Sequence, residues 1–97
     1  MSPDRWLDAR RPTPPDALRG HFPGGVGAPA SLADELGGRA LEALRRSLRT
    51  PGRVRESAFD LLAADALLTY ACEAALESPD PEGVLGAILR RIVVEGE

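Results

Sequence analysis

The sequence is poor in the residues from which metal and catalytic sites are usually built. Its 97 residues include one His and one Cys, His21 and Cys72, which lie far apart in the chain. Metal sites need several imidazole, thiolate or carboxylate ligands at suitable spacing, and no Glu-x-x-His pair is present for a ferritin-like carboxylate site. The glycine-rich segment 24–27 follows no strand-like run and precedes no Gly-Lys-Ser/Thr, so it is not a phosphate loop. We expect no metal, no cofactor and no recognisable catalytic constellation.

Other absences narrow the class of protein. Lys, Asn and Gln are missing and all 12 basic residues are Arg, as a G+C-rich bacterial coding sequence would give. A single Cys cannot form an internal disulfide. The segment MSPDRWLDARRP has no apolar stretch of a signal peptide, and the most apolar stretch, 61–76, is broken by acids and short for a membrane span. A net charge of −3 argues against a nucleic-acid partner, because nucleic-acid binders usually carry a basic balance. We expect a cytoplasmic bacterial protein without membrane contact.

Proline and glycine are concentrated in the first thirty residues, which hold six of the nine prolines and four of the ten glycines. Two Pro-containing start signals predict short helices over 4–10 and 15–21. The segment 23–29 is a loop that we expect to be mobile. Four apolar side chains can dock this N-terminal arm onto a core: Trp6, Leu7, Leu18 and Phe22. We divide the chain into an arm, 1–30, and a helical domain, 31–97.

The remaining sequence predicts three helices. Ala and Leu dominate the apolar residues, whereas the β-favouring residues are scarce. Ser31 followed by Asp34 resembles a capping box and opens a helix over 32–49. Thr50-Pro51-Gly52 ends it, a long helix follows from 53 or 54 to 77, and Pro81 begins a third. We therefore predict an all-α fold, a small three-helix bundle with a long central helix and a Pro/Gly-rich N-terminal arm.

The long helix carries a polar face that changes direction midway. Acids and a serine mark one side near its start, whereas Asp65, Thr69, Glu73 and Glu77 follow at i,i+4 on nearly the opposite side. A helix of this kind is covered by different neighbours at its two ends, within a bundle or across a subunit interface. A carboxylate at Asp65 is costly if it is buried without a partner. We single out Asp65, Leu67 and Leu68 as a possible interface or buried ion pair.

A cluster of arginines offers an alternative. The six residues Arg39, Arg45, Arg46, Arg49, Arg53 and Arg55 fall within seventeen positions. Guanidinium groups suit phosphate and carboxylate partners. Several of these residues, however, lie in the last turns of a helix, where a cation interacts favourably with the negative end of the helix dipole. The cluster could bind an anion, a nucleic acid or an acidic partner, or form a solvated face.

An enzymatic function is the third alternative. The groups that could serve it are His21, Asp60, Asp65 and Glu73, and a pocket that places His21 beside a carboxylate would favour it. The string Leu61-Leu62-Ala63-Ala64-Asp65-Ala66-Leu67-Leu68-Thr69-Tyr70-Ala71 resembles one helix of the all-α polyprenyl diphosphate synthases. That family's aspartate-rich metal-binding motif, DDxxD, is absent, so the resemblance implies no activity.

The leading hypothesis is a small non-enzymatic helical protein that acts through protein–protein contact. It would either self-associate or serve as an accessory or regulatory subunit. With three main helices and many alanines the core is thin, and pairing long helices across a two-fold axis would bury more surface. We expect a homodimer.

Overall fold

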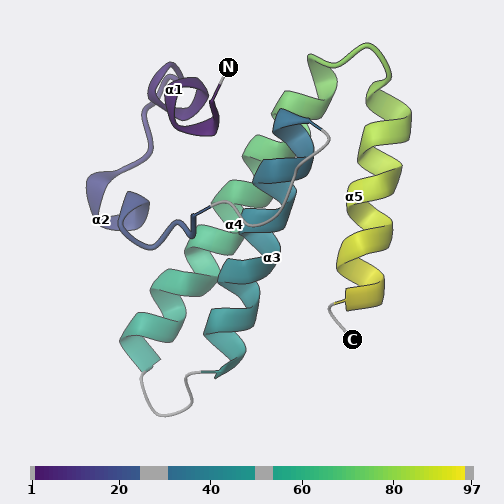
Figure 1. Ribbon diagram of the computed structural model, residues 1–97. Coiled ribbons are helices and arrows are strands. Elements are labelled where there is room, and N and C mark those ends of the chain that lie inside the picture. Colours follow the sequence, from purple (N-terminus) through teal and green to yellow (C-terminus); the bar gives the residue numbers. More distant parts are fainter. Residues whose placement is uncertain (1, 25–30, 50–53, 96–97) are drawn as a thin grey trace.

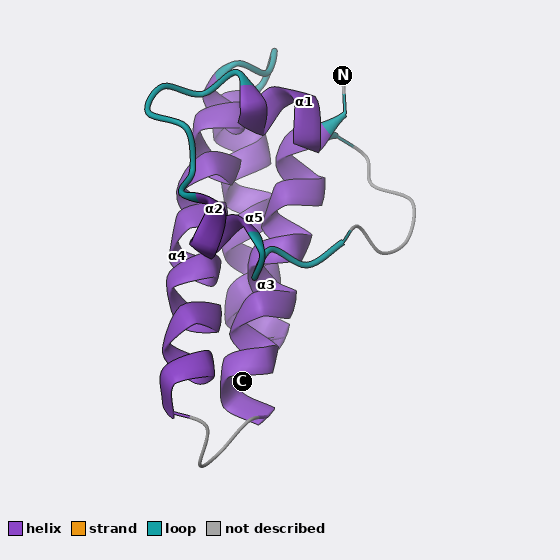
Figure 2. Ribbon diagram, turned by 90° about the vertical axis from the view of Figure 1, so that its left-hand side faces the viewer, coloured by secondary structure: helices purple, strands orange, loops and turns teal. Residues whose placement is uncertain are grey.

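The computed structural model describes residues 2–24, 31–49 and 54–95, and shows an all-helical protein (Figure 1). The helices are α1 (Pro3–Asp8), α2 (Asp16–Arg19), α3 (Leu32–Arg49), α4 (Val54–Leu76) and α5 (Pro81–Glu95). Within these ranges no residue forms a strand (Figure 2). The prediction of a bundle with a long central helix and short helical turns in the N-terminal arm is confirmed. The predicted mobile loop, 23–29, falls mostly outside the described residues.

Local capping explains where the helices begin. The Ser31 hydroxyl accepts a hydrogen bond from the amide of Asp34 at 3.0 Å, as the capping-box pattern predicts. Ser2 caps α1 in the same way through the amide of Arg5. Asp80 accepts a hydrogen bond from the amide of Gly83 at 3.2 Å, and Pro81 occupies the first position of α5, where its missing N–H costs nothing. The sequence therefore positions each of these starts by local chemistry.

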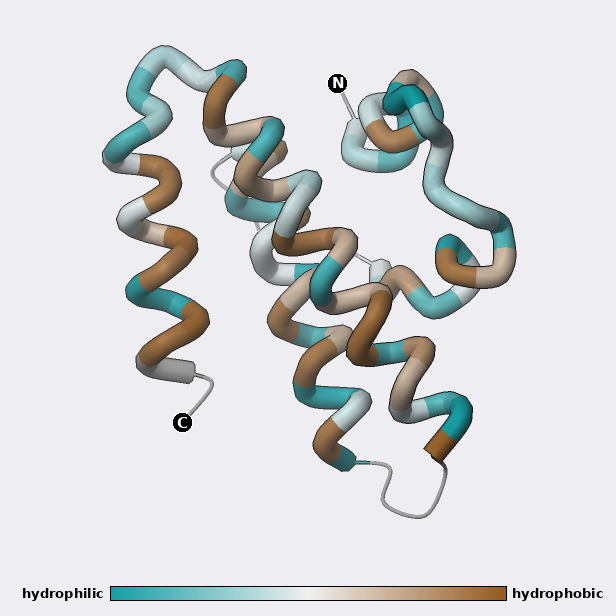
Figure 3. The backbone as a smooth tube through the Cα atoms, turned by 180° about the vertical axis from the view of Figure 1, so that it is seen from behind, coloured by the Kyte–Doolittle hydropathy of each residue, from teal (hydrophilic) through white to brown (hydrophobic). Residues whose placement is uncertain are grey.

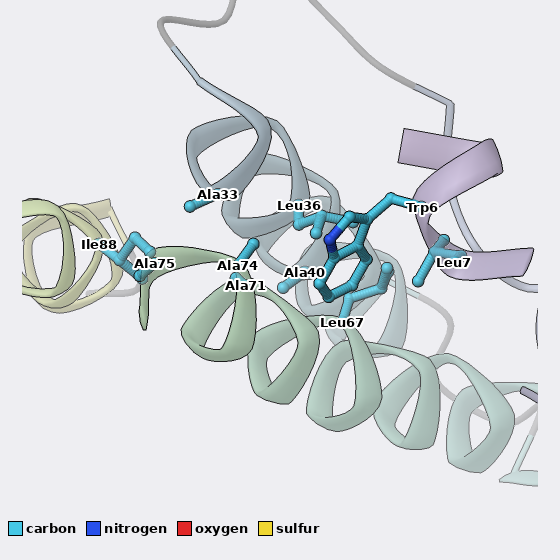
Figure 4. Close-up of a cluster of buried hydrophobic side chains, with 10 residues drawn as sticks. All are labelled: Trp6, Leu7, Ala33, Leu36, Ala40, Leu67, Ala71, Ala74, Ala75 and Ile88. Carbon is cyan, nitrogen blue, oxygen red and sulfur yellow. The ribbon is translucent and has the colours of Figure 1, made fainter. Parts of the chain in front are cut away.

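The core lies mainly between α3 and α4, and it is built largely from alanine. Its largest fully buried side chains are Leu7 of α1, Leu36 of α3 and Leu67 of α4, and Trp6 of the arm packs on the same cluster (Figure 4). The two helices otherwise meet through small side chains: Ala33, Ala40 and Ala43 on α3, and Ala63, Ala64, Ala71, Ala74 and Ala75 on α4. Small residues let two helices lie close together, so this alanine seam holds the long pair.

The arm and α5 lie on opposite sides of the α3/α4 pair (Figure 1). The helix α5 packs against the upper part of the pair through Ile88, whose Cγ1 lies 3.5 Å from where a Cβ on Gly37 would be. The sequence predicts that the missing side chain at Gly37 allows a close helix approach, and α5 is the helix that approaches. Among the described helices, none is both long and apolar enough to cross a membrane.

Gly37 gives the first testable prediction. A Cβ at this position would meet Ile88 at an ordinary van der Waals distance of 3.5 Å, while alanine is a better helix former than glycine. Gly37→Ala is therefore expected to raise the free energy of unfolding by about 0.5–1 kcal/mol in urea denaturation. Gly37→Leu should lower it, because the larger side chain would displace Ile88. If Gly37→Ala proves destabilising, the helices α3 and α5 approach more closely than described.

Candidate functional site

The six arginines of the predicted basic cluster do not form one patch. Arg39 is buried and turns toward the arm, where its guanidinium lies 3.4 Å from Asp4 Oδ1 and 3.0 Å from Glu35 Oε1. It therefore fastens α1 to α3. Such a buried, doubly paired guanidinium is not exposed to an external anion.

The other arginines lie nearer the end of α3. Arg45, Arg46 and Arg49 surround one carboxylate, that of Glu42, at distances of 4.0, 4.0 and 2.8 Å. Arg53 lies outside the described residues, and Arg55 is exposed in the first turn of α4. Because Glu42 offsets part of the charge, the exposed face is less basic than the sequence indicates.

His21 lies beside a carboxylate, the arrangement that the enzymatic alternative requires. Its Nδ1 lies 3.1 Å from Oδ1 of Asp60, so the ring nitrogen donates to the carboxylate. Its ring stacks on Phe59, with the two centroids 5.1 Å apart and the planes 15° from parallel. No sequence pattern signals this pair, because 39 residues separate its members.

A carboxylate that orients an imidazole through Nδ1 is one half of an acid–base constellation. Within the described residues His21 makes no hydrogen bond to a hydroxyl or thiol that could act as a nucleophile, and the hydroxyl of Ser57, one turn from Asp60, donates to the carbonyl of Ser47. The same pair connects the end of the arm to α4, so it also has a structural role in holding the arm on the bundle. The enzymatic alternative stays a prediction.

The other charged residues that the sequence offers for catalysis do not converge. Glu73 lies 3.9 Å from the guanidinium of Arg10, which binds Glu77 at 3.2 Å. Asp65 is exposed, and its carboxylate makes no hydrogen bond or ion pair within the described residues. In the ranges 2–24, 31–49 and 54–95, no group of three His, Cys, Asp or Glu side chains could hold a metal ion.

The predicted trio of Asp65, Leu67 and Leu68 is divided by the structure. Leu67 is fully buried in the core of the protomer, so it is not available to a partner. Asp65 and Leu68 instead line an apolar groove of about 450 Å³. Consecutive helix residues point about 100° apart, which explains why neighbours in sequence have different surroundings.

The groove runs between α3 and α4 on the side that faces α5. It is lined by Ala40, Leu41, Leu44, Leu61, Leu62, Ala64, Asp65, Leu68 and Ile92. Leu61 and Leu62 are 54% and 55% exposed although they are large and apolar. Asp65 is the one charged residue among these lining residues, so an occupant of the groove meets hydrocarbon and a single carboxylate.

Further exposed apolar side chains lie within one helical turn of residues that line the groove. Leu48 lies one turn beyond Leu44 on α3, and Leu89 lies one turn before Ile92 on α5, with Val93 one turn after Leu89. Figure 3 shows how apolar residues recur along α4 and α5. We refer to the groove together with Leu48, Leu89 and Val93 as the outer apolar face. Large exposed apolar side chains gathered near an apolar groove mark an interaction site more often than scattered single residues do.

Comparison with protein-family models, with curated proteins and with solved structures finds no match to this chain.

Proposed function

We propose that this protein acts through protein–protein contact, and that it self-associates through the outer apolar face. The observation that carries the proposal is the exposure of Leu61 and Leu62 beside an apolar groove. Burying large apolar side chains stabilises an assembly by about 1.5–3 kcal/mol each. The face lies opposite the arm, so a partner could cover it without displacing Trp6 or Leu7.

The lining of the groove favours an apolar occupant. It is hydrocarbon apart from one carboxylate, Asp65, and Leu61 and Leu62 among its lining residues are more than half exposed. A second copy of the chain supplies a matching apolar face with no further component.

The anion-binding alternative stays a prediction with weaker support. Arg39 forms an ion pair with Asp4 of the arm, and the carboxylate of Glu42 forms ion pairs with three of the exposed arginines. A binder that relies on phosphate contacts needs several unpaired cations on one surface. The described part of the chain offers fewer of these than the sequence indicates.

Light scattering after size-exclusion chromatography tests the proposal. The wild-type protein should show twice the mass of the 10.3 kDa chain. The double variant Leu61→Glu/Leu62→Glu should be monomeric, with dimerisation weakened by about 100-fold or more, because each substitution acts twice in a two-fold interface. Both positions are exposed, so the helix content measured by circular dichroism should stay unchanged.

Ala17→Glu is the matched control, since it adds a Glu at an exposed position of α2 in the arm. This variant should dimerise as the wild type does. A wild-type protein that remains monomeric at every accessible concentration would contradict the proposal. So would a folded Leu61→Glu/Leu62→Glu variant that keeps the dimer mass.

A further inference from the structure

The first half of α4 carries a stripe of exposed residues on one side of the helix. They are Arg55, Ala58, Leu62 and Asp65, and each is exposed in the protomer. Because they follow one another at gaps of three or four residues, their side chains point within about 80° of each other around the helix. This half of α4 lies at the end of the long helix pair away from α1 (Figure 1). We refer to these residues as the α4 stripe.

The two charged residues of the α4 stripe have no partner in the protomer. Within the described residues the side chains of Arg55 and Asp65 make no hydrogen bond or ion pair. They cannot pair with each other, because ten residues of helix separate them by about 15 Å along the axis. Asp60, which lies between them in sequence, is by contrast 3.1 Å from His21. Both charges of the stripe are therefore available to another molecule.

The α4 stripe is complementary to its own reversed copy. When two identical helices lie antiparallel, the numbers of facing residues have a constant sum. The numbers of Arg55 and Asp65 add up to 120, and so do those of Ala58 and Leu62. One register therefore places each cation opposite an anion and each large apolar side chain opposite a small one.

A two-fold axis produces this antiparallel pair. If the axis lies in the interface and crosses α4 at a right angle, it reverses the helix and places α4 of the second copy against α4 of the first. In the register described above the axis passes opposite position 60, at the middle of the α4 stripe. Two Ala58–Leu62 contacts then flank the axis, and two Arg55–Asp65 contacts lie outside them. An apolar centre with a charged rim is the usual anatomy of a protein–protein interface.

The order of the residues disfavours the other ways of pairing the same stripe. A two-fold axis parallel to α4 would keep the two helices in the same direction, so that each residue would face its own copy. Arg55 would then meet Arg55 and Asp65 would meet Asp65, which is unfavourable. An antiparallel pair shifted by seven in the sum would place Leu62 against the carboxylate of Asp65, which is costly to bury without a partner.

We propose that two copies of this chain pair antiparallel through the first half of α4 about a two-fold axis, with Arg55 of each copy bound to Asp65 of the other. This pairing rests on the proposed self-association and specifies its geometry. Leu62 and Asp65 also line the apolar groove, so the contact includes the α4 side of the outer apolar face. Apolar burial supplies the affinity, while the two ion pairs select the direction and register of the helices.

Charge reversal tests the register. Arg55→Asp places two carboxylates against each other at both symmetry-related contacts, and Asp65→Arg places two guanidinium groups there. Each variant alone should dimerise about tenfold or more weakly than the wild type, because the lost attraction and the new repulsion occur twice. Sedimentation equilibrium over a range of protein concentrations measures these dissociation constants. Both positions are exposed, so the helix content should stay unchanged in circular dichroism.

Exchanging the two charges within one chain gives the sharper measurement. In the double variant Arg55→Asp/Asp65→Arg, position 55 of each copy again faces the opposite charge at position 65 of the other. Its dissociation constant should therefore return to within about threefold of that of the wild type. Damage to the fold would add up in this variant instead of cancelling.

Arg5→Asp is the matched control, since it makes the same change of charge at an exposed position of α1. The side chain of Arg5 makes no ion pair within the part of the chain that the structure describes. This variant should dimerise as the wild type does.

The outcomes separate the register from the self-association. If the wild type dimerises and both single variants dimerise equally well, the register is wrong and the self-association stands. If both single variants are weakened but the double variant is not restored, positions 55 and 65 do not meet across the interface. If the wild type is monomeric at every accessible concentration, the proposed function itself fails.

Discussion

Leu67→Ala is expected to lower the free energy of unfolding by about 3–4 kcal/mol. Leu67 is 0% exposed and is one of the few large side chains in the core. The alanines around it have no rotatable side chains with which to fill the space. The cavity should therefore persist, which places the cost in the upper part of the usual range for this substitution.

Urea denaturation followed by circular dichroism at 222 nm measures this loss. Leu76→Ala is the control on the same helix, because Leu76 is 66% exposed and its truncation should change stability by no more than about 0.5 kcal/mol. A domain of this size has a total stability of about 5–15 kcal/mol. A loss below about 1 kcal/mol for Leu67→Ala would mean that the core rearranges around the missing side chain.

Trp6→Ala is expected to release the N-terminal arm at a cost of about 3–5 kcal/mol. Trp6 is 3% exposed, its indole N–H donates to Glu77 Oε2 at 3.3 Å, and the guanidinium of Arg10 stacks 3.9 Å above its ring. The ring of Tyr70 meets it edge-on at 6.1 Å. Trp6 thus joins the arm to the bundle through apolar burial, an aromatic contact with Tyr70 and a hydrogen bond to Glu77.

Two measurements separate loss of the arm from loss of the bundle. Trypsin should cleave after Arg10 and Arg19 much faster in Trp6→Ala than in the wild type, because a released arm is accessible. Trp6→Phe keeps most of the apolar contact and loses the hydrogen bond. Because of that lost bond, its free energy of unfolding should be only about 1 kcal/mol below that of the wild type. Equal stability of the two variants, with unchanged cleavage, would show that Trp6 does not fasten the arm.

The helices could be predicted from the sequence because their signals are local. Ser31 and Pro81 mark starts that depend on neighbouring residues alone, and α3 begins and ends where its amphipathic pattern does. The docking of Trp6 and Leu7 also follows from their apolar character, since an exposed arm would leave both in water.

The partners of the arm could not be predicted. Arg39 reaches Asp4 across 35 residues, and His21 reaches Asp60 across 39. Such contacts depend on the side of the α3/α4 pair over which the arm passes, and neither composition nor periodicity specifies that side. The surroundings of Leu67 and Leu68 could not be predicted for the same reason. Both residues are apolar in the sequence, and only the packing of α3 places Leu67 in the core and Leu68 in the groove.

The alanine seam has a consequence for how this sequence can diverge. Ala63, Ala71 and Ala75 are fully buried between α4 and its neighbours. At such positions natural selection limits the size of the side chain more strictly than its hydrophobicity. Gly or Ser would be accepted there, whereas Val or Leu would push the helices apart. Sequences descended from this chain could replace most leucines by other apolar residues. They would still share a regular spacing of small residues along two long helices.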